Sequence, residues 1–105
     1  MKKKKETLIK VLKITKEKGI HQVEFNPTNE EIQKQVNGYY GCFRFGENTA
    51  VLFDEEARFK SEPYTASVAG FELMGPILIV GCKREGFTSL SKKDIPLIKS
   101  KVKLL

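Results

Sequence analysis

The side chains that could carry out covalent or metal chemistry are few and far apart. The chain holds one histidine, His21, and two cysteines, Cys42 and Cys82. Nucleophilic catalysis needs a nucleophile, a base and an orienting group within reach of one another. Zinc sites need about three or four protein ligands, usually in short-spaced pairs. Neither pattern is present, so the sequence predicts a non-enzymatic binding protein without metal or cofactor.

The other candidate catalytic groups also favour structural roles. Glu55 and Glu56 are adjacent in a predicted turn, so they cannot face each other across a scissile bond as glycosidase carboxylates do. His21 falls on the same face of an alternating strand as Val23 and Phe25, and it has no matched acid. A packed or edge histidine is therefore favoured over a catalytic base.

A better candidate for a binding site is the polar segment 61–67. Its hydroxyls, carboxylate and aromatic ring could hold an anionic or aromatic ligand by hydrogen bonds and stacking. Two cations come just before it, and two tyrosines lie earlier in the chain, one of which could stack. The predicted ligand-binding residues are Arg58, Lys60, Tyr64, Thr65, Tyr39 and Tyr40. A structural crossover is the alternative interpretation of this segment.

Positive charge is concentrated at the two ends of the chain, which carries a net charge of +6. The basic residues of these ends include Lys2, Lys3, Lys4, Lys5, Lys92, Lys93, Lys99, Lys101 and Lys103. If the ends meet on one face, they form a patch that attracts polyanions. The alternative is a solvated surface that keeps the protein soluble. Lysines outnumber arginines, which argues against base-specific recognition.

A length of 105 residues predicts a basic tail at 1–6 followed by a single domain at 7–105. Apolar stretches are too short to span a bilayer, and Lys10 and Lys13 interrupt any signal-like segment. We therefore expect a cytoplasmic protein with reduced cysteines and no membrane partner, although a disulfide between Cys42 and Cys82 is the alternative.

These residues must be positioned by elements that the hydrophobic pattern predicts. Thr28 and Glu31 have the spacing of a capping box, so a helix should begin at Asn29 and end at Asn37-Gly38. A second helix should follow Asp94 and cover 95–102. Strands are predicted at 7–14, 20–25, 39–45, 49–53 and 76–81, with a lead-in at 71–74 and an irregular segment at 60–69.

Together these elements predict an α+β fold with a mixed or mainly antiparallel sheet of about five strands and two short helices. The strand at 76–81 should lie at the centre of the sheet. Exposed sheet edges make a homodimer a further expectation.

The order of these motifs resembles that of a family of small bacterial and bacteriophage proteins catalogued as a domain of unknown function. The resemblance is carried by the segments Leu8-Ile9-Lys10-Val11-Leu12, Val23-Glu24-Phe25, Gly38-Tyr39, Val51-Leu52-Phe53-Asp54-Glu55-Glu56, Met74-Gly75-Pro76 and Phe87-Thr88-Ser89-Leu90. It implies a phage, prophage or conjugative-element origin and supplies no catalytic residues. The family tends to show Pro-Asn-Arg-Ala in the polar loop, where this chain has Pro63-Tyr64-Thr65-Ala66.

We therefore expect a binding protein of phage or mobile-element origin, with a role against host defence. It would either sequester a small anionic, nucleotide-like ligand or mask a host protein. The alternative is a nucleic-acid-binding accessory protein that uses the lysine-rich ends.

Overall fold

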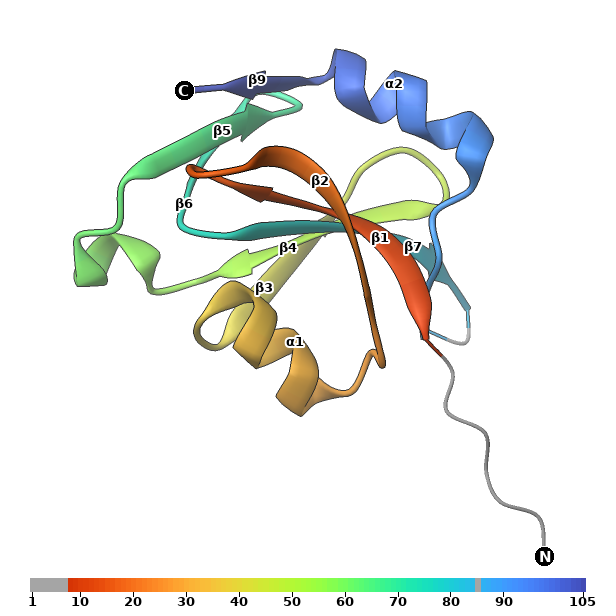
Figure 1. Cartoon of the computed structure of the whole chain (residues 1–105), viewed down its shortest axis with the longest axis horizontal. Helices are drawn as coiled ribbons and strands as arrows, with labels where there is room; N and C mark the ends of the chain where they lie inside the picture. Colours follow the sequence, from red (N-terminus) through yellow and green to blue (C-terminus); the bar gives the residue numbers. More distant parts are fainter. Residues whose placement is uncertain (1–7, 85) are drawn as a thin grey trace, which may run out of the picture.

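The computed structural model describes residues 8–84 and 86–105, so the predicted tail with Lys2, Lys3, Lys4 and Lys5 lies outside the described residues. An antiparallel sheet with the strand order β2-β1-β7-β4-β3 forms the central layer (Figure 1). Its strands are β1 (Ile9–Thr15), β2 (Gly19–Phe25), β3 (Tyr40–Arg44), β4 (Thr49–Asp54) and β7 (Ile77–Lys83). A short strand, β8 (Gly86–Thr88), pairs with the end of β7.

A second, smaller sheet packs across one face of the central sheet. It has the order β6-β5-β9. Its strands are β5 (Tyr64–Val68), β6 (Phe71–Met74) and β9 (Val102–Leu104). The helices are α1 (Asn29–Val36) and α2 (Ile95–Ser100), with the 3-10 turns η1 (Ala57–Lys60) and η2 (Lys92–Asp94). Helix α1 covers one face of the central sheet, while the small sheet and α2 lie over the other (Figure 1).

The core is split in two by the central sheet because successive side chains of a strand point to opposite faces. On β7, Leu78 and Val80 pack toward α1, whereas Ile77 and Ile79 pack toward the small sheet and α2. These four side chains are completely buried. A continuous apolar run is the expected sequence of a strand that is covered on both faces, and β7 is central as predicted.

The ends of α1 confirm the predicted capping signals. The Thr28 hydroxyl accepts a hydrogen bond from the Glu31 backbone N–H at 3.1 Å. Asn37 ends the helix in the left-handed conformation with φ 66°. The second helix begins directly after Asp94 as predicted, but it ends at Ser100, and Val102 belongs to β9.

The α+β class and the mainly antiparallel pairing are confirmed, but the predicted number of strands was wrong. The described residues form nine strands in two sheets. Much of the segment 60–69, predicted to be irregular, is β5, because Thr65, Ala66 and Val68 are all buried. The sequence did not reveal β5 for two reasons. Some of its buried side chains are small and give a weak apolar signal. Its pairing partners are β6 and β9, and β9 lies far along the chain.

Both cysteines are free, with Cys42 exposed on β3 and Cys82 half-buried on β7. Among the described residues, no helix has the length and apolar character needed to cross a bilayer. Strands β2 and β3 form the edges of the central path, and the predicted homodimer stays a prediction.

Lys13 provides a test of the packing between β1 and α1. Its Nζ donates to Gln35 Oε1 at 2.9 Å. Burial, and to a lesser extent the charge of Lys18, lower the pKa of Lys13 from its ordinary value of 10.5. The unfolded chain therefore binds more protons just below pH 10.5, and the free energy of unfolding rises with pH in that window.

We accordingly expect Lys13→Met to be more stable than the wild type at neutral pH, because the variant places no desolvated charge against α1. The difference should shrink as the pH approaches 10.5. Urea unfolding at a series of pH values measures this, with the exposed Lys99→Met as control. A stability difference between Lys13→Met and the wild type that grows toward alkaline pH would contradict the prediction.

Candidate functional site

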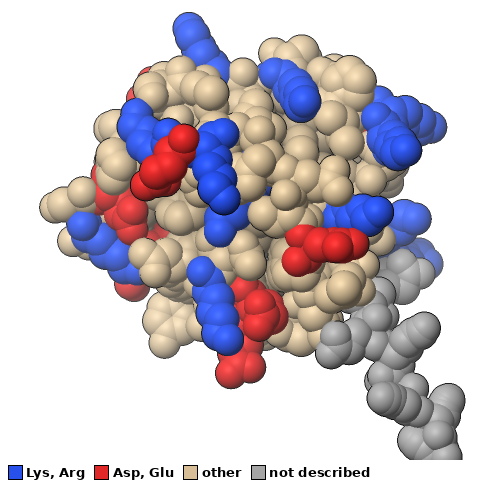
Figure 2. Space-filling view, viewed as in Figure 1, with Lys and Arg blue, Asp and Glu red and all other residues tan. Residues whose placement is uncertain are grey.

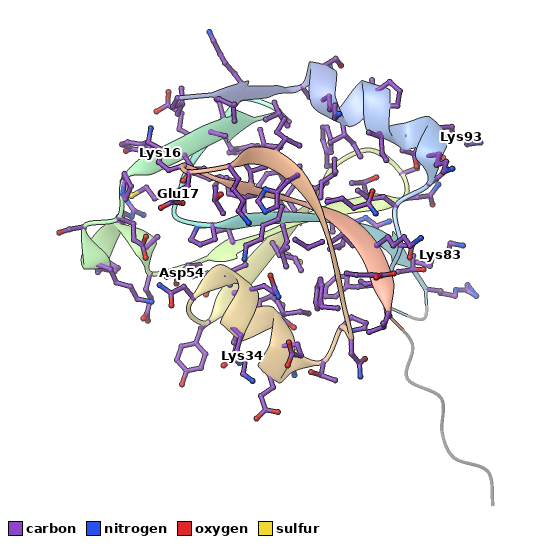
Figure 3. All side chains as sticks on the ribbon, viewed as in Figure 1. Lys16, Glu17, Lys34, Asp54, Lys83 and Lys93 are labelled. Carbon is purple, nitrogen blue, oxygen red and sulfur yellow. The ribbon has the colours of Figure 1, made fainter. Side chains whose placement is uncertain are left out.

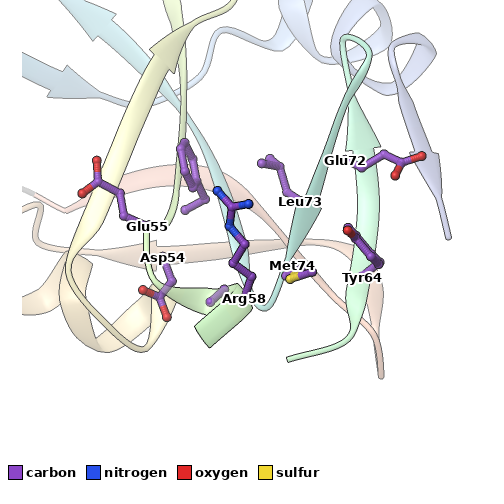
Figure 4. A pocket seen from close by; sticks show the side chains of 9 residues that line it. Asp54, Glu55, Arg58, Tyr64, Glu72, Leu73 and Met74 are labelled. Atoms are coloured by element: carbon purple, nitrogen blue, oxygen red, sulfur yellow. The ribbon is translucent and has the colours of Figure 1, made fainter. Parts of the chain in front are cut away.

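A cavity of about 280 Å³ opens between the end of β4, η1 and the strands β5 and β6 (Figure 4). In Figure 4 the Arg58 side chain extends between Glu55 on one side and Leu73 and Met74 on the other, with Tyr64 beyond them. The lining residues are Phe53, Asp54, Glu55, Ala57, Arg58, Tyr64, Glu72, Leu73 and Met74. The cavity thus combines an apolar floor with one guanidinium, one phenol and several carboxylates.

An ion pair between a buried carboxylate and an exposed lysine holds η1 in place beside this cavity. Asp54 is 3% exposed, and its Oδ2 accepts a hydrogen bond from Lys60 Nζ at 2.8 Å. The other oxygen, Oδ1, accepts the Glu56 backbone N–H at 3.0 Å. Lys60 Nζ also donates to the Asn37 carbonyl oxygen at 2.8 Å, which ties η1 to the end of α1. The hydrogen bond to Asp54 is the main reason that the pKa of Lys60 is raised above 10.5.

The glycine after α1 is required by this ion pair. A Cβ atom added to Gly38 would lie 2.6 Å from Asp54 Oδ1 and 2.7 Å from Lys60 Nζ. Such separations are well inside van der Waals contact, so a larger residue would push the pair apart. Gly38 therefore allows the end of α1 to lie close to the Asp54–Lys60 pair.

The structure brings together only part of the predicted ligand-binding set. Arg58 and Tyr64 line the same cavity, and Tyr64 is 48% exposed. Tyr39 is 68% exposed on a neighbouring segment, where its carbonyl oxygen accepts the Glu55 backbone N–H at 3.0 Å. These three side chains are free to meet a partner.

The other three predicted residues have their polar groups engaged inside the protein. Lys60 is paired with Asp54, as described above. The Thr65 hydroxyl is buried and donates to the Gly75 carbonyl oxygen at 2.7 Å. The Tyr40 hydroxyl donates to Asn29 Oδ1 at 2.5 Å. Lys60, Thr65 and Tyr40 thus position the segments that carry Arg58, Tyr64 and Tyr39.

One exposed aromatic residue was missed by the sequence reasoning. Phe59 is 81% exposed on η1, directly beside Arg58. The sequence does contain a signal for it. Phe59 lies between two cations, Arg58 and Lys60, at a position where no strand or helix periodicity predicts an apolar residue. We refer to Arg58, Phe59, Tyr64 and Tyr39 as the η1 surface.

Carboxylates surround the η1 surface. Those on the neighbouring segments are Glu55, Glu56, Glu62 and Glu72, in addition to the paired Asp54. Figure 3 shows Asp54 on the α1 side of the molecule, at the opposite end from Lys83 and Lys93. Arg58 is the one cation of the η1 surface, and Lys60, the other cation of η1, is paired with Asp54.

The remaining chemistry-bearing residues are dispersed. His21 lies on β2, where its Nδ1 is 3.1 Å from the Gly19 carbonyl oxygen. Within residues 8–84 and 86–105, no three His, Cys, Asp or Glu side chains gather to hold a metal ion.

Comparison with known proteins gives one match. The family model described as a domain of unknown function (DUF3846) matches residues 9–103. Neither the curated proteins nor the solved structures yield a match.

Proposed function

The chain belongs to the DUF3846 family of domains of unknown function, and from this premise we propose that it is a non-enzymatic binding protein that masks a partner protein with its η1 surface. The observation that supports this most is the 81% exposure of Phe59 beside Arg58. Exposed apolar side chains that gather in one patch mark interaction sites, and Tyr64 and Tyr39 are further exposed aromatic residues on the segments next to η1.

The composition of the η1 surface supports a protein partner. Tyrosine and arginine are the side chains most enriched among binding hot spots, and aromatic residues in general are enriched in interface cores. Arg58, Phe59 and Tyr64 follow one another over a short stretch of chain. The Glu55 backbone N–H, just before η1, donates to the Tyr39 carbonyl oxygen. The Lys60–Asp54 pair ties η1 to the end of β4, and a segment that is already anchored loses less entropy on binding.

The charge around the η1 surface indicates the chemistry of the partner. Glu55 and Glu72 line the cavity with Arg58, and Glu56 directly precedes η1. These carboxylates would attract a basic protein surface while repelling an acidic one. Arg58, at the centre, would pair with a carboxylate of the partner. A basic partner surface with an apolar patch and one acidic residue therefore fits best.

A second version of the proposal is sequestration of a small anionic, nucleotide-like ligand. Arg58 and Tyr64 line one cavity and could bind an anion and stack on a ring. The cavity of about 280 Å³ is slightly below the range of about 300–1,000 Å³ typical of ligand pockets. Its single cation also faces the carboxylates Glu55 and Glu72, so we rank this version second.

For the biological setting we propose a phage or mobile-element protein that acts against host defence in the bacterial cytoplasm. This rests on the family resemblance described for the sequence. A protein that masks a host factor needs only a surface and no turnover, which agrees with the scarcity of reactive side chains.

The test is capture of bacterial proteins on immobilised full-length protein, with identification by mass spectrometry. We expect at least one protein to be retained by the wild type and lost from Arg58→Ala and Phe59→Ala. Truncation of a hot-spot side chain costs about 2 kcal/mol or more, which corresponds to about 30-fold weaker binding. Leu97→Ala and Lys99→Ala on α2 remove an exposed apolar and a basic side chain elsewhere and should retain the protein.

Identical captured proteins for the η1 variants and the α2 variants would refute masking by this surface. The ligand version has its own measurement, since a bound nucleotide stabilises the folded state and raises the melting temperature. A melting temperature that stays flat across mono-, di- and cyclic oligonucleotides would exclude sequestration.

A further inference from the structure

We propose that a second surface, at the opposite end of the molecule, binds the phosphate backbone of nucleic acid without sequence preference. It is built from the start of β1, the turn between β7 and β8, and η2. Its residues are Lys10, Lys83, Arg84, Lys92 and Lys93, which we call the basic corner. All five are exposed.

Backbone hydrogen bonds bring these segments together although they are far apart in the sequence. The Lys10 backbone N–H donates to Ser89 Oγ at 2.9 Å, and the Leu90 N–H donates to the Lys10 carbonyl oxygen at 3.0 Å. Lys10 and Lys92 line a shared cavity of about 350 Å³, together with Gln22 and Ser89. The start of β1 is therefore fixed against the segment that leads into η2.

The remaining cations of the basic corner are placed by the turn before β8 and by η2. Lys83 ends β7 and Arg84 follows it, and Lys83 pairs with Gly86 across the turn. Figure 3 shows Lys83 and Lys93 on the same side of the molecule, and Figure 2 shows several basic side chains on that side. This side lies at the opposite end of the molecule from Asp54.

Carboxylates near the basic corner reduce its potential but do not neutralise it. Glu24 is opposite Lys10 in the β1–β2 register, Asp94 follows Lys93, and Glu85 follows Arg84 in the sequence. Among the described residues, none of the five cations lies within 4.0 Å of a carboxylate oxygen. The carboxylates of residues 8–84 and 86–105 therefore do not form ion pairs with these cations.

The layout of the cations fits a polyanion with repeated charges. The five cations are spread over three segments and do not converge on one enclosed pocket, so several phosphates of a backbone could be contacted at once. Four of the five are lysines, which bind phosphate as point charges and carry no base specificity.

The test is fluorescence anisotropy of full-length protein with labelled short duplex DNA over a range of salt concentrations. We expect a complex at about 50 mM salt whose affinity falls steeply toward about 200 mM, with a slope close to one per phosphate contact. The triple variant Lys83→Gln, Lys92→Gln, Lys93→Gln should bind at least about tenfold more weakly, and its salt slope should be lower by about 3.

The matched control is Lys16→Gln, Lys18→Gln, Lys34→Gln, which removes the same charge from the β1–β2 turn and α1. It should stay within about threefold of the wild type, because charges beyond about 10 Å are largely screened. Absence of a complex at about 50 mM salt, equal weakening by both triple variants, or full binding by the basic-corner variant would each overturn the proposal. Tighter binding to vesicles of anionic lipid than to DNA would reassign the surface to a membrane.

This proposal is independent of the η1 surface. The basic-corner variant should still capture the protein partner, and Arg58→Ala should still bind DNA.

Discussion

Replacing Gly81 by alanine is expected to lower the free energy of unfolding by about 3 kcal/mol, at the upper end of the usual cost of overpacking. Gly81 is a buried residue of β7 that pairs with Thr88 of β8. A Cβ atom at this position would lie 2.4 Å from the Ser89 carbonyl oxygen and 2.9 Å from Thr88 Cγ2. Because the nearest atom belongs to the backbone, no change of rotamer can relieve the clash.

The control for this prediction is a second substitution that removes only the side-chain part of the clash. Thr88→Ala alone should cost little, since Thr88 is only half-buried. In the Gly81→Ala background it should restore only a minor part of the lost stability, because the Ser89 carbonyl oxygen remains in place. Urea unfolding of the two single variants and the double variant measures this, and complete rescue by Thr88→Ala would show that the side chain is the obstacle.

The same clash should weaken nucleic-acid binding. Ser89 accepts the hydrogen bond from Lys10, so displacement of the β8 segment would separate Lys10 from Lys92. Partial loss of DNA affinity at a temperature where Gly81→Ala remains folded is the expected result.

Replacing Asp54 by alanine is expected to cost about 2 kcal/mol, the range of hydrogen bonds made by a charged group. The Asp54 side chain is completely buried and accepts hydrogen bonds from Lys60 and from the Glu56 N–H. Alanine would leave the Glu56 N–H without its partner, and Lys60 Nζ would keep only its hydrogen bond to the Asn37 carbonyl oxygen. The matched control is Glu31→Ala, which breaks the exposed pair with Lys34 and should cost about 0.5 kcal/mol or less.

The contribution of the Asp54–Lys60 pair to the free energy of unfolding should also depend on pH. The pKa of Lys60 is raised above 10.5 in the folded protein, so its contribution to stability is complete below pH 10.5. That contribution is lost as the pH rises through the raised pKa. The difference in unfolding free energy between the wild type and Asp54→Ala should therefore be constant from neutral pH to pH 10.5 and narrow above it. Partner capture by Asp54→Ala should also fall, because η1 carries Arg58 and Phe59.

The elements that were predicted correctly are those whose signals lie within a short segment of the sequence. The capping box at Thr28 and Glu31, the left-handed Asn37 and the apolar run of β7 are all read from short segments. The small sheet could not be predicted in this way, because β5 becomes a strand only by pairing with β6 and with β9, which lies far along the chain.

The candidate site was predicted only in part, because the long-range contacts of its residues are not visible in the sequence. The sequence placed Arg58 and Tyr64 close together, and they do line one cavity. It gave no means of knowing that Lys60 has a buried carboxylate partner or that the Thr65 hydroxyl is used by the Gly75 carbonyl. Whether a polar side chain is available to a ligand depends on these long-range partners, which only the fold supplies.

The position of β7 has a consequence for how the nascent chain reaches its folded state. The hairpins β1–β2 and β3–β4 are local in sequence and can form early during synthesis, but β7 must enter between β1 and β4 to join them. Until translation reaches β7, each hairpin has an apolar edge without a partner, and such edges favour aggregation. Ribosome pausing before Ile77, or depletion of chaperones, should therefore reduce the soluble yield more than the equilibrium stability would suggest.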